Sequence, residues 1–295
     1  MLMNLRDICQ IAEQNNMAVA AVNAASLEAI RAAIVVSEET GYPIIIQHAE
    51  VHESLVPLST IAPIVTSLAE RSSAQVCLHL DHCEHLSYAR RALDLGFTGV
   101  MFDGSALPYE LNVERSCAAA DMCAEFSAGL ECELGSMGSR EGGDADRGST
   151  AQQAGAIYTD PTQAREFVLS TGLDALACSF GTVHGLYCGE PNLNFDVLEQ
   201  IRAQVKVPLV MHGGSGVSDE DNKRAIDAGV RKINYYTYGV KYAGEAVLDM
   251  VRDREKGSER PVVYWHDMTT AAYESLVRTF DHIVRNFANG ADALA

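Results

Sequence analysis

Short apolar runs alternate with longer amphipathic stretches along most of the chain. Each run holds six or seven residues rich in valine, isoleucine, leucine and alanine. Runs of this length and composition are typical of buried β-strands. The pattern predicts strands at 17–23, 43–49, 76–81, 99–104, 129–135, 175–181, 207–213 and 231–237.

Helix signals fall between these runs. Ser26 precedes an amphipathic stretch that stops at Gly41, a pattern typical of a helix N-cap and a left-handed residue after the C-terminus. A second stretch stops at Gly96, and Asp160 before Pro161 opens a third, because proline suits the first position of a helix. Strands and helices therefore alternate, which indicates the α/β class.

Eight strands that alternate with helices predict a (β/α)8 TIM barrel, a fold of roughly 250 residues. A doubly wound open sheet is the alternative. That fold usually has a glycine-rich loop after its first strand, and the segment 21–29 contains no glycine. Two more helix patterns follow the eighth strand, so we expect residues 1–295 to form a single barrel domain with an extra C-terminal helix. The segment 136–160 is long and rich in Gly, Ser, Asp and Arg, and we expect a functional loop such as a lid.

Composition narrows the possible partners and location. The chain carries 22 basic and 40 acidic residues, a net charge of -18, which argues against nucleic acid and anionic membrane surfaces as partners. No apolar run is long enough to predict a membrane span, and the polar segment 1–16 does not resemble a signal peptide. The eight scattered cysteines include no CxxC and are expected to be buried thiols. We expect a cytoplasmic protein.

Histidines stand at several predicted strand ends. The carboxyl ends of barrel strands meet at one mouth, and His82, His184 and His212 follow the third, sixth and seventh predicted strands. Imidazole is a common zinc ligand, and three protein ligands leave a fourth position open for a substrate. The sequence therefore predicts a zinc site at these three residues. The histidines expected to be ordinary core or surface residues are His48, His52 and His85.

A glycine cluster follows the seventh strand. Gly213, Gly214 and Ser215 lie where barrels often bind phosphate, and glycines let backbone N–H groups approach an anion. Asn234 and Thr237, at the end of the eighth strand, offer an amide and a hydroxyl. We expect a phosphate site here, although a plain tight turn is the alternative.

A metal ion beside a phosphate pocket indicates a phosphorylated carbonyl substrate. The metal can bind the oxygens of dihydroxyacetone phosphate and stabilise the enediolate formed when a proton leaves carbon. Aldol chemistry also needs a base for that proton and an acid for the aldehyde oxygen. Asp81, beside His82, is the candidate acid, and Glu141 in the long loop is the candidate base once the loop closes.

At these residues the chain resembles the class II, metal-dependent ketose-bisphosphate aldolases, which include fructose- and tagatose-bisphosphate aldolases. The similarity runs nearly end to end, through AVNA, HLDH, MFDGS, ECELG, YTDP, GTVHG, MHGGSG and KIN. It implies zinc ligands at His82, His184 and His212, and Asp81 as catalytic acid/base. It implies a possible second divalent or monovalent cation near Asp103 and Glu133. The residues that would hold the donor substrate are Asn23, Gly185, Gly213, Gly214, Ser215, Asn234 and Thr237.

The chain departs from the family pattern near the aldehyde side. Tyr235, Tyr236 and Tyr238 surround Thr237, and QHAEVHE stands after the second strand where a Ser-Gly-containing stretch is common. These bulky groups are expected to reshape the aldehyde pocket. Glu141 matches the family's loop glutamate only in part, because glycine follows it in place of aspartate. The arginines considered for a second phosphate are Arg140 and Arg278.

The resemblance implies a zinc-dependent aldolase that reversibly cleaves a ketose 1-phosphate or 1,6-bisphosphate to dihydroxyacetone phosphate and an aldehyde. It also implies a homodimer or homotetramer with a small phosphorylated sugar as its substrate. Two other functions remain open at this point. One is a metal-dependent barrel hydrolase that uses zinc-bound hydroxide, and the other is a non-catalytic sugar-phosphate-binding homologue.

Overall fold

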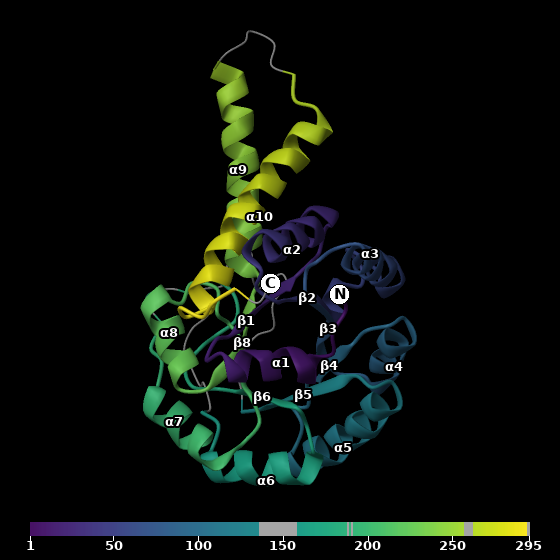
Figure 1. Cartoon of the computed structure of the whole chain (residues 1–295), viewed down its shortest axis with the longest axis vertical. Helices are drawn as coiled ribbons and strands as arrows, with labels where there is room; N and C mark the ends of the chain where they lie inside the picture. Colours follow the sequence, from purple (N-terminus) through teal and green to yellow (C-terminus); the bar gives the residue numbers. More distant parts are fainter. Residues whose placement is uncertain (136–157, 188, 190, 257–261, 294–295) are drawn as a thin grey trace.

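The computed structural model describes residues 1–135, 158–187, 189, 191–256 and 262–293. Its eight strands are all parallel and close into a barrel in the order β1 to β8 (Figure 1). The predicted (β/α)8 fold is therefore confirmed. The strands are β1 (Val19–Asn23), β2 (Ile44–Ala49), β3 (Val76–Cys83), β4 (Gly99–Phe102), β5 (Gly129–Leu134), β6 (Ala175–Cys178), β7 (Leu209–Met211) and β8 (Val230–Tyr235).

Helices follow the strands and form the outer layer of the barrel (Figure 1). They are α2 (Leu27–Thr40), α3 (Leu58–Glu70), α4 (Leu86–Asp94), α5 (Tyr109–Glu125), α6 (Pro161–Thr171), α7 (Phe195–Gln204), α8 (Asp219–Asp227), α9 (Thr237–Lys256) and α10 (Trp265–Phe287), with a short 3-10 helix η1 (Glu50–His52) after β2. The predicted lid, 136–160, lies mostly outside the described residues.

The predicted caps are present. The Ser26 side chain accepts a hydrogen bond from the backbone N–H of Ala29, and Gly41 ends α2 with a φ of 71°. Asp160 accepts hydrogen bonds from two backbone N–H groups at the start of α6, and proline occupies its first turn. Such caps satisfy backbone groups that a helix end leaves without intrahelical partners. The boundaries of these helices thus follow directly from local sequence.

One helix was not predicted. Helix α1 (Leu5–Gln14) precedes the first strand, and its apolar residues Leu5, Ile8, Cys9 and Ala12 are completely buried. They pack against inward-facing residues of β1 to β4, β6 and β7 and fill one end of the barrel. The segment is amphipathic, and its apolar stripe is not recognised when only the polar composition and charge of the segment are considered.

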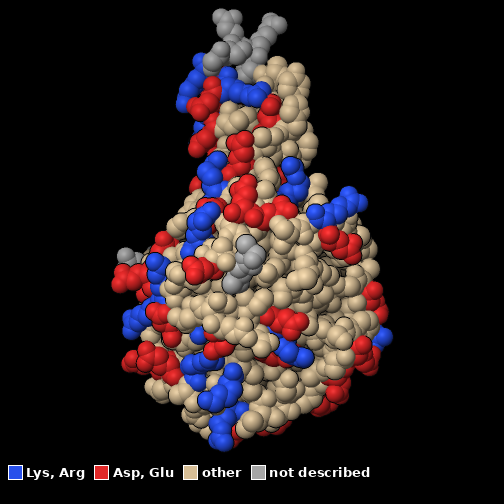
Figure 2. All heavy atoms as spheres, viewed as in Figure 1, with Lys and Arg blue, Asp and Glu red and all other residues tan. Residues whose placement is uncertain are grey.

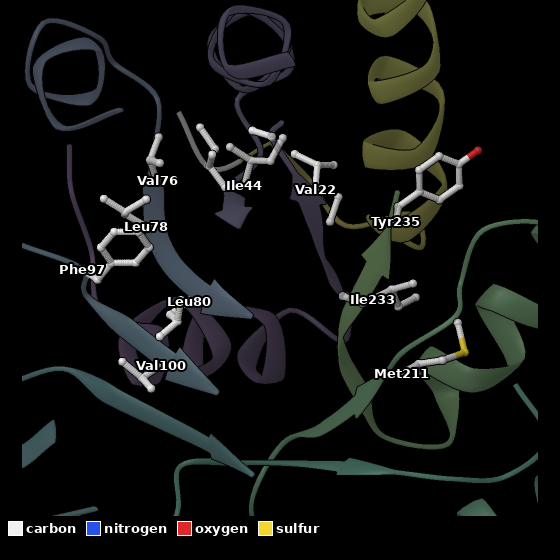
Figure 3. Close-up of a cluster of buried hydrophobic side chains, with 14 of the residues drawn as sticks. Val22, Ile44, Val76, Leu78, Leu80, Phe97, Val100, Met211, Ile233 and Tyr235 are labelled. Atoms are coloured by element: carbon white, nitrogen blue, oxygen red, sulfur yellow. The ribbon is translucent and has the colours of Figure 1, made fainter. Parts of the chain in front are cut away.

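The outward strand faces and the surrounding helices form the larger hydrophobic core. Figure 3 shows part of it, with Val22, Ile44, Leu78 and Ile233 on different strands. Side chains alternate along each strand, so the residues between these point into the barrel. The inner face is apolar at the α1 end and polar toward the opposite mouth. The polar groups of the inner face are therefore concentrated at the carboxyl ends of the strands.

Helices α9 and α10 extend beyond the barrel as an arm (Figure 1). Helix α10 packs against both α9 and α2, which anchors the base of the arm. On the face shown in Figure 2, acidic and basic residues are interspersed along one side of the arm, and the α10 side shows few charges. Across the described ranges, every helix is too short or too polar to cross a bilayer.

Candidate active site

Three histidine side chains meet at the mouth of the barrel. The Nε2 atom of His82 lies 3.3 Å from Nε2 of His184 and 2.9 Å from Nδ1 of His212. All three side chains are buried. Three nitrogen ligands of a tetrahedral zinc ion, at bond lengths of about 2.0–2.1 Å, lie ~3.3 Å from one another. The donor set and its spacing therefore fit one divalent metal ion.

Backbone irregularity aims His82 into this cluster. The pairing of β3 with β4 shifts register between Leu80 and Cys83, and His82 has a φ of 44°. Such irregularities re-aim a side chain at the rim of a barrel, and a left-handed non-glycine residue persists only where its surroundings hold it. His184 and His212 stand just beyond the ends of β6 and β7, so three separate strands supply the three imidazoles.

Two acidic residues lie on the far side of His82. Its Nδ1 is 2.9 Å from Oδ2 of Asp103 and 3.9 Å from Oε2 of Glu133. An ionised carboxylate only accepts hydrogen bonds, so Nδ1 carries a hydrogen toward Asp103, and Nε2 is the atom that would face a bound metal. His82, Asp103 and Glu133 also form a second group with metal-ligand spacing. The second cation near Asp103 and Glu133 stays a prediction.

Asp81 is held between two amides. Nδ2 of Asn23 donates to its Oδ2 at 2.8 Å, and Nδ2 of Asn234 donates to its Oδ1 at 3.1 Å. The Asn23 carbonyl in turn accepts from Nε2 of Gln47 at 2.7 Å. Both carboxylate oxygens of Asp81 are therefore oriented by neighbouring strands. Asn23 and Asn234, predicted as substrate ligands, make contacts within the protein that already use both ends of each amide.

The charges around the cluster shift the pKa values of its members in opposite directions. Burial alone would raise the pKa of Asp81, but its electrostatic interactions with His82, His212 and Lys232 outweigh burial and hold that pKa well below its usual range. Burial opposes protonation of His82, yet Asp81 and Asp103 raise its pKa to about 9. Burial and then the charge of His82 lower the pKa of His184. Asp81 is thus an ionised carboxylate at neutral pH.

Burial and the adjacent Asp103 raise the pKa of Glu133 well above its usual range. In the metal-free protein, burial and the charge of Asp103 thus favour the protonated form of Glu133. A cation bound beside Asp103 and Glu133 would reverse that balance, because a nearby positive charge favours the ionised form.

The predicted phosphate loop follows β7. Gly213 has a φ of 65°, and a Cβ there would collide with the backbone carbonyl of Val183. The N–H of Gly214 already donates to the carbonyl of Asn234 at 3.1 Å, and Ser215 Oγ accepts from the N–H of Tyr236 at 3.0 Å. These bonds fasten the loop to the end of β8.

Thr237 begins α9 immediately beyond, so a helix N-terminus faces the same region. N-termini of helices favour anions because their first N–H groups lack intrahelical partners. Gly185, directly after His184, has a φ of 91°, a backbone conformation suited to glycine. The phosphate-binding roles of these residues stay predictions.

A polar layer lies beneath the site, and its lysine was not predicted from the sequence. Lys232 is completely buried in β8, and its Nζ lies 2.7 Å from Oε2 of Glu131 and 2.8 Å from Oδ1 of Asn234. The other oxygen of Glu131 accepts from Nε2 of His212 at 2.8 Å. A lysine two positions before Asn234 in a strand buried on both faces was the available signal, since such a lysine needs a partner.

The three tyrosines at the end of β8 separate. Tyr235 points outward into the core around the barrel (Figure 3) and, with Tyr238, lines a surface cleft of about 490 Å³. Arg278 lines the same cleft, so in this chain it lies outside the barrel mouth. Tyr236 instead packs against His52, with ring centroids 4.9 Å apart. The predicted base Glu141, and also Arg140, lie outside the described residues.

The fold and this site define a class of protein: barrel enzymes whose mouth can hold a divalent metal on histidines beside an ionised carboxylate. Comparison with known proteins assigns the family. The model of the class II fructose-bisphosphate aldolases matches residues 3–288, and the chain belongs to this family. It is a lyase whose reaction is cleavage of a ketose phosphate to dihydroxyacetone phosphate and an aldehyde. The hydrolase and the non-catalytic homologue are set aside.

Individual relatives agree. The chain is 35% identical to the D-tagatose-1,6-bisphosphate aldolase subunit GatY of Klebsiella oxytoca over 272 residues, which cover 92% of this chain and 93% of that protein. It matches the crystal structure of the YdjI aldolase of Escherichia coli K12 with a TM-score of 0.82 and 29% identity, over 99% and 98% of the two chains. A putative fructose-1,6-bisphosphate aldolase of Coccidioides immitis shares the fold, with a TM-score of 0.82, 24% identity and 97% coverage of both chains.

Proposed function

We propose that the chain uses one catalytic Zn²⁺ ion, held by His82, His184 and His212, to cleave a ketose 1-phosphate or 1,6-bisphosphate. The observation that carries the proposal is the convergence of three buried imidazole nitrogens beside an ionised carboxylate that two amides hold. When bound, the cation would stabilise the negative charge that develops on the oxygens of the donor. Zinc is favoured by the all-imidazole set, although the same ligands suit other divalent metals.

In the cleavage direction, Asp81 takes the proton of the hydroxyl group at C4. The bond between C3 and C4 then breaks, the aldehyde leaves, and its bonding electrons remain on the donor. The depressed pKa of Asp81 supports this role, because only an ionised carboxylate can accept that proton. In the condensation direction, Asp81 returns the proton to the aldehyde oxygen. Glu141 is proposed to exchange the proton at the donor carbon.

The donor phosphate is proposed to lie against Gly213, Gly214 and Ser215, with Gly185 and Thr237 completing the pocket. The start of α9 at Thr237 supports this placement, since the positive end of a helix dipole favours an anion even in a strongly acidic protein. The N–H of Gly214 already donates to the carbonyl of Asn234. The proposed role of Gly214 is therefore to let the ligand come close to the backbone, because glycine has no side chain.

The first test is exchange of the labelled carbon-bound proton of dihydroxyacetone phosphate, with no aldehyde supplied. The proposal expects exchange that a chelator abolishes and Zn²⁺ restores. His212→Ala is expected to lose the metal, because two ligands remain. Exchange that persists in metal-free protein, or full zinc occupancy in His212→Ala, would contradict the assignment. Leu169→Ala, a change of an exposed residue on α6, serves as the control for handling and folding.

A further inference from the structure

The polar layer beneath the three histidines centres on a buried cation. Lys232 lies in the middle of β8 with 0% exposure. Its ammonium group forms an ion pair with Glu131 at 2.7 Å and donates a hydrogen bond to Oδ1 of Asn234 at 2.8 Å. Glu131 is also completely buried. Neither residue touches the position expected for a substrate, yet both contact residues that do the proposed chemistry.

The contact with Asn234 sets the direction of its amide. An ammonium group has three donors and no acceptor, so Asn234 must turn its oxygen toward Lys232. Its NH2 group then faces the opposite way and donates to Oδ1 of Asp81 at 3.1 Å. A flipped amide would place an oxygen against that carboxylate and lose both bonds. Lys232 therefore fixes which end of Asn234 meets Asp81.

The contact with Glu131 sets the tautomer of His212. One oxygen of Glu131 faces Lys232, and the other lies 2.8 Å from Nε2 of His212. Because the carboxylate can only accept, Nε2 must carry the hydrogen. The lone pair is then on Nδ1, the atom that lies 2.9 Å from Nε2 of His82 in the metal cluster. A carboxylate that orients a ligating imidazole is a common device in metal sites.

We propose that Lys232 is a positioning residue that acts through two partners at once. Through Glu131 it fixes the metal-facing tautomer of His212, and through Asn234 it fixes the donor that orients Asp81. One buried ammonium group thus couples the metal ligand to the proton-transfer carboxylate. The inference rests on the proposed roles of His212 and Asp81. It adds a residue that touches neither metal nor substrate.

The test compares Lys232→Met with Arg231→Met. Arg231 is the neighbouring residue of β8, is also buried, and pairs with Glu13 away from the site at 2.9 Å. Both variants therefore remove a buried cation from the same strand. We expect Lys232→Met to weaken Zn²⁺ or Co²⁺ binding about 10- to 100-fold in chelator competition and to alter the visible spectrum of the Co²⁺ form. Arg231→Met is expected to keep wild-type values of both.

Kinetic measurements test the second part of the proposal, the orientation of Asp81 through Asn234. At Co²⁺ concentrations that saturate Lys232→Met, kcat for cleavage is expected to stay about 10-fold or more below wild type, with a smaller change in KM, because Asp81 is no longer held. A lysine that serves stability alone predicts wild-type metal affinity, spectrum and kcat in the folded variant. That result would overturn the proposal.

A second variant tests the proposal if Lys232→Met does not fold. Lys232→Met leaves Glu131 buried without its cation, whereas Lys232→Met/Glu131→Gln removes both charges and is expected to fold. The double variant should show the same spectral change and low kcat, and wild-type behaviour would again overturn the proposal. Failure of the proposed function looks different: wild-type protein and His212→Ala would then bind Co²⁺ equally, whatever stands at position 232.

Discussion

At the residue scale, the site depends on side chains that each serve two partners. Asn234 accepts from Lys232 and donates to Asp81, and Glu131 contacts both Lys232 and His212. In a buried environment every such donor and acceptor needs its partner, so one substitution disturbs several contacts. Effects of single changes at these positions are therefore expected to be non-additive.

Asp81→Ala tests the division of labour between the two proton transfers. We expect cleavage to fall by about 10²- to 10⁴-fold, the range for loss of a general acid/base. Metal content should be retained, and exchange of the donor carbon-bound proton should continue, because that step is assigned to a different residue. Metal analysis and the exchange assay measure both. Turnover at the wild-type rate would remove Asp81 from the mechanism.

Tyr236 is expected to influence the aldehyde rather than the donor. Val22 of β1 pairs with Tyr235 of β8, so the next residues of the two strands, Asn23 and Tyr236, are neighbours. Asn23 donates a hydrogen bond to Asp81. We expect Tyr236→Ala to change the ratio of kcat/KM between two ketose phosphates that differ in their aldehyde halves by about 10-fold. Donor exchange should change less than about threefold by the same reasoning.

The control for this measurement is Tyr238→Ala, since Tyr238 lines the outer cleft. It should leave the substrate ratio near that of the wild type. An equal shift in both variants would show that the tyrosines act through general packing and that the inward position of Tyr236 has no special effect.

At the element scale, the contact between β2 and α4 buries an imidazole. His48 is fully buried, and its Nε2 lies 3.3 Å from the hydroxyl of Tyr88, which donates to Glu53 at 2.7 Å. The single hydroxyl hydrogen goes to Glu53, so His48 is the donor to Tyr88. Burial and then the charge of His52 lower the pKa of His48 from 6.5 to about 4, although Glu53 opposes this.

This shift predicts a pH-dependent stability. Below pH 6.5 the unfolded chain binds a proton at His48 that the folded protein does not, so stability falls as the pH drops from 6.5 toward 4. The loss at pH 5 is about 2 kcal/mol. Urea unfolding of metal-free protein at pH 7 and pH 5 gives the loss in the free energy of unfolding between the two pH values. We expect this loss to be about 2 kcal/mol smaller in His48→Gln than in the wild type. An unchanged difference would mean that other groups account for the acid sensitivity.

At the scale of the whole molecule, the α9–α10 arm bears exposed apolar side chains. Trp265 is 75% exposed, and the others on or beside the arm are Val240, Leu248, Val262 and Tyr264. Contiguous apolar surface on a soluble protein commonly marks an interaction site. We therefore propose that this surface mediates the homodimer or homotetramer that the family resemblance implies.

Trp265→Asp is expected to lower the assembly state, because a charge on this surface must lose its water in an interface. Light scattering of the metal-loaded protein measures the mass directly. Leu169→Asp is the matched control, since Leu169 is 73% exposed on α6, away from the arm. If both variants keep the mass of the wild type, or if the wild type is a monomer of 31.8 kDa, the arm does not mediate assembly.

The sequence by itself determined the alternation of strands and helices, the caps at Ser26 and Asp160, and the family. These features depend on local pattern: apolar periodicity and capping chemistry act over a few residues. The candidate metal ligands were also predictable, because the carboxyl ends of barrel strands converge whatever lies between them. The predicted strand ends were less accurate, because β6 ends at Cys178 and β7 at Met211, before the predicted residues 181 and 213.

Only the tertiary structure decided what depends on contacts between distant segments. Helix α1 lies at one end of the barrel because residues from six strands cover its apolar face. Lys232 meets Glu131 across about 100 positions of chain, and Tyr236 packs against His52 while Tyr235 and Tyr238 line the outer cleft. A pairing of buried charges, an amide direction or a side-chain face is set by the closure of the barrel, which no local pattern encodes.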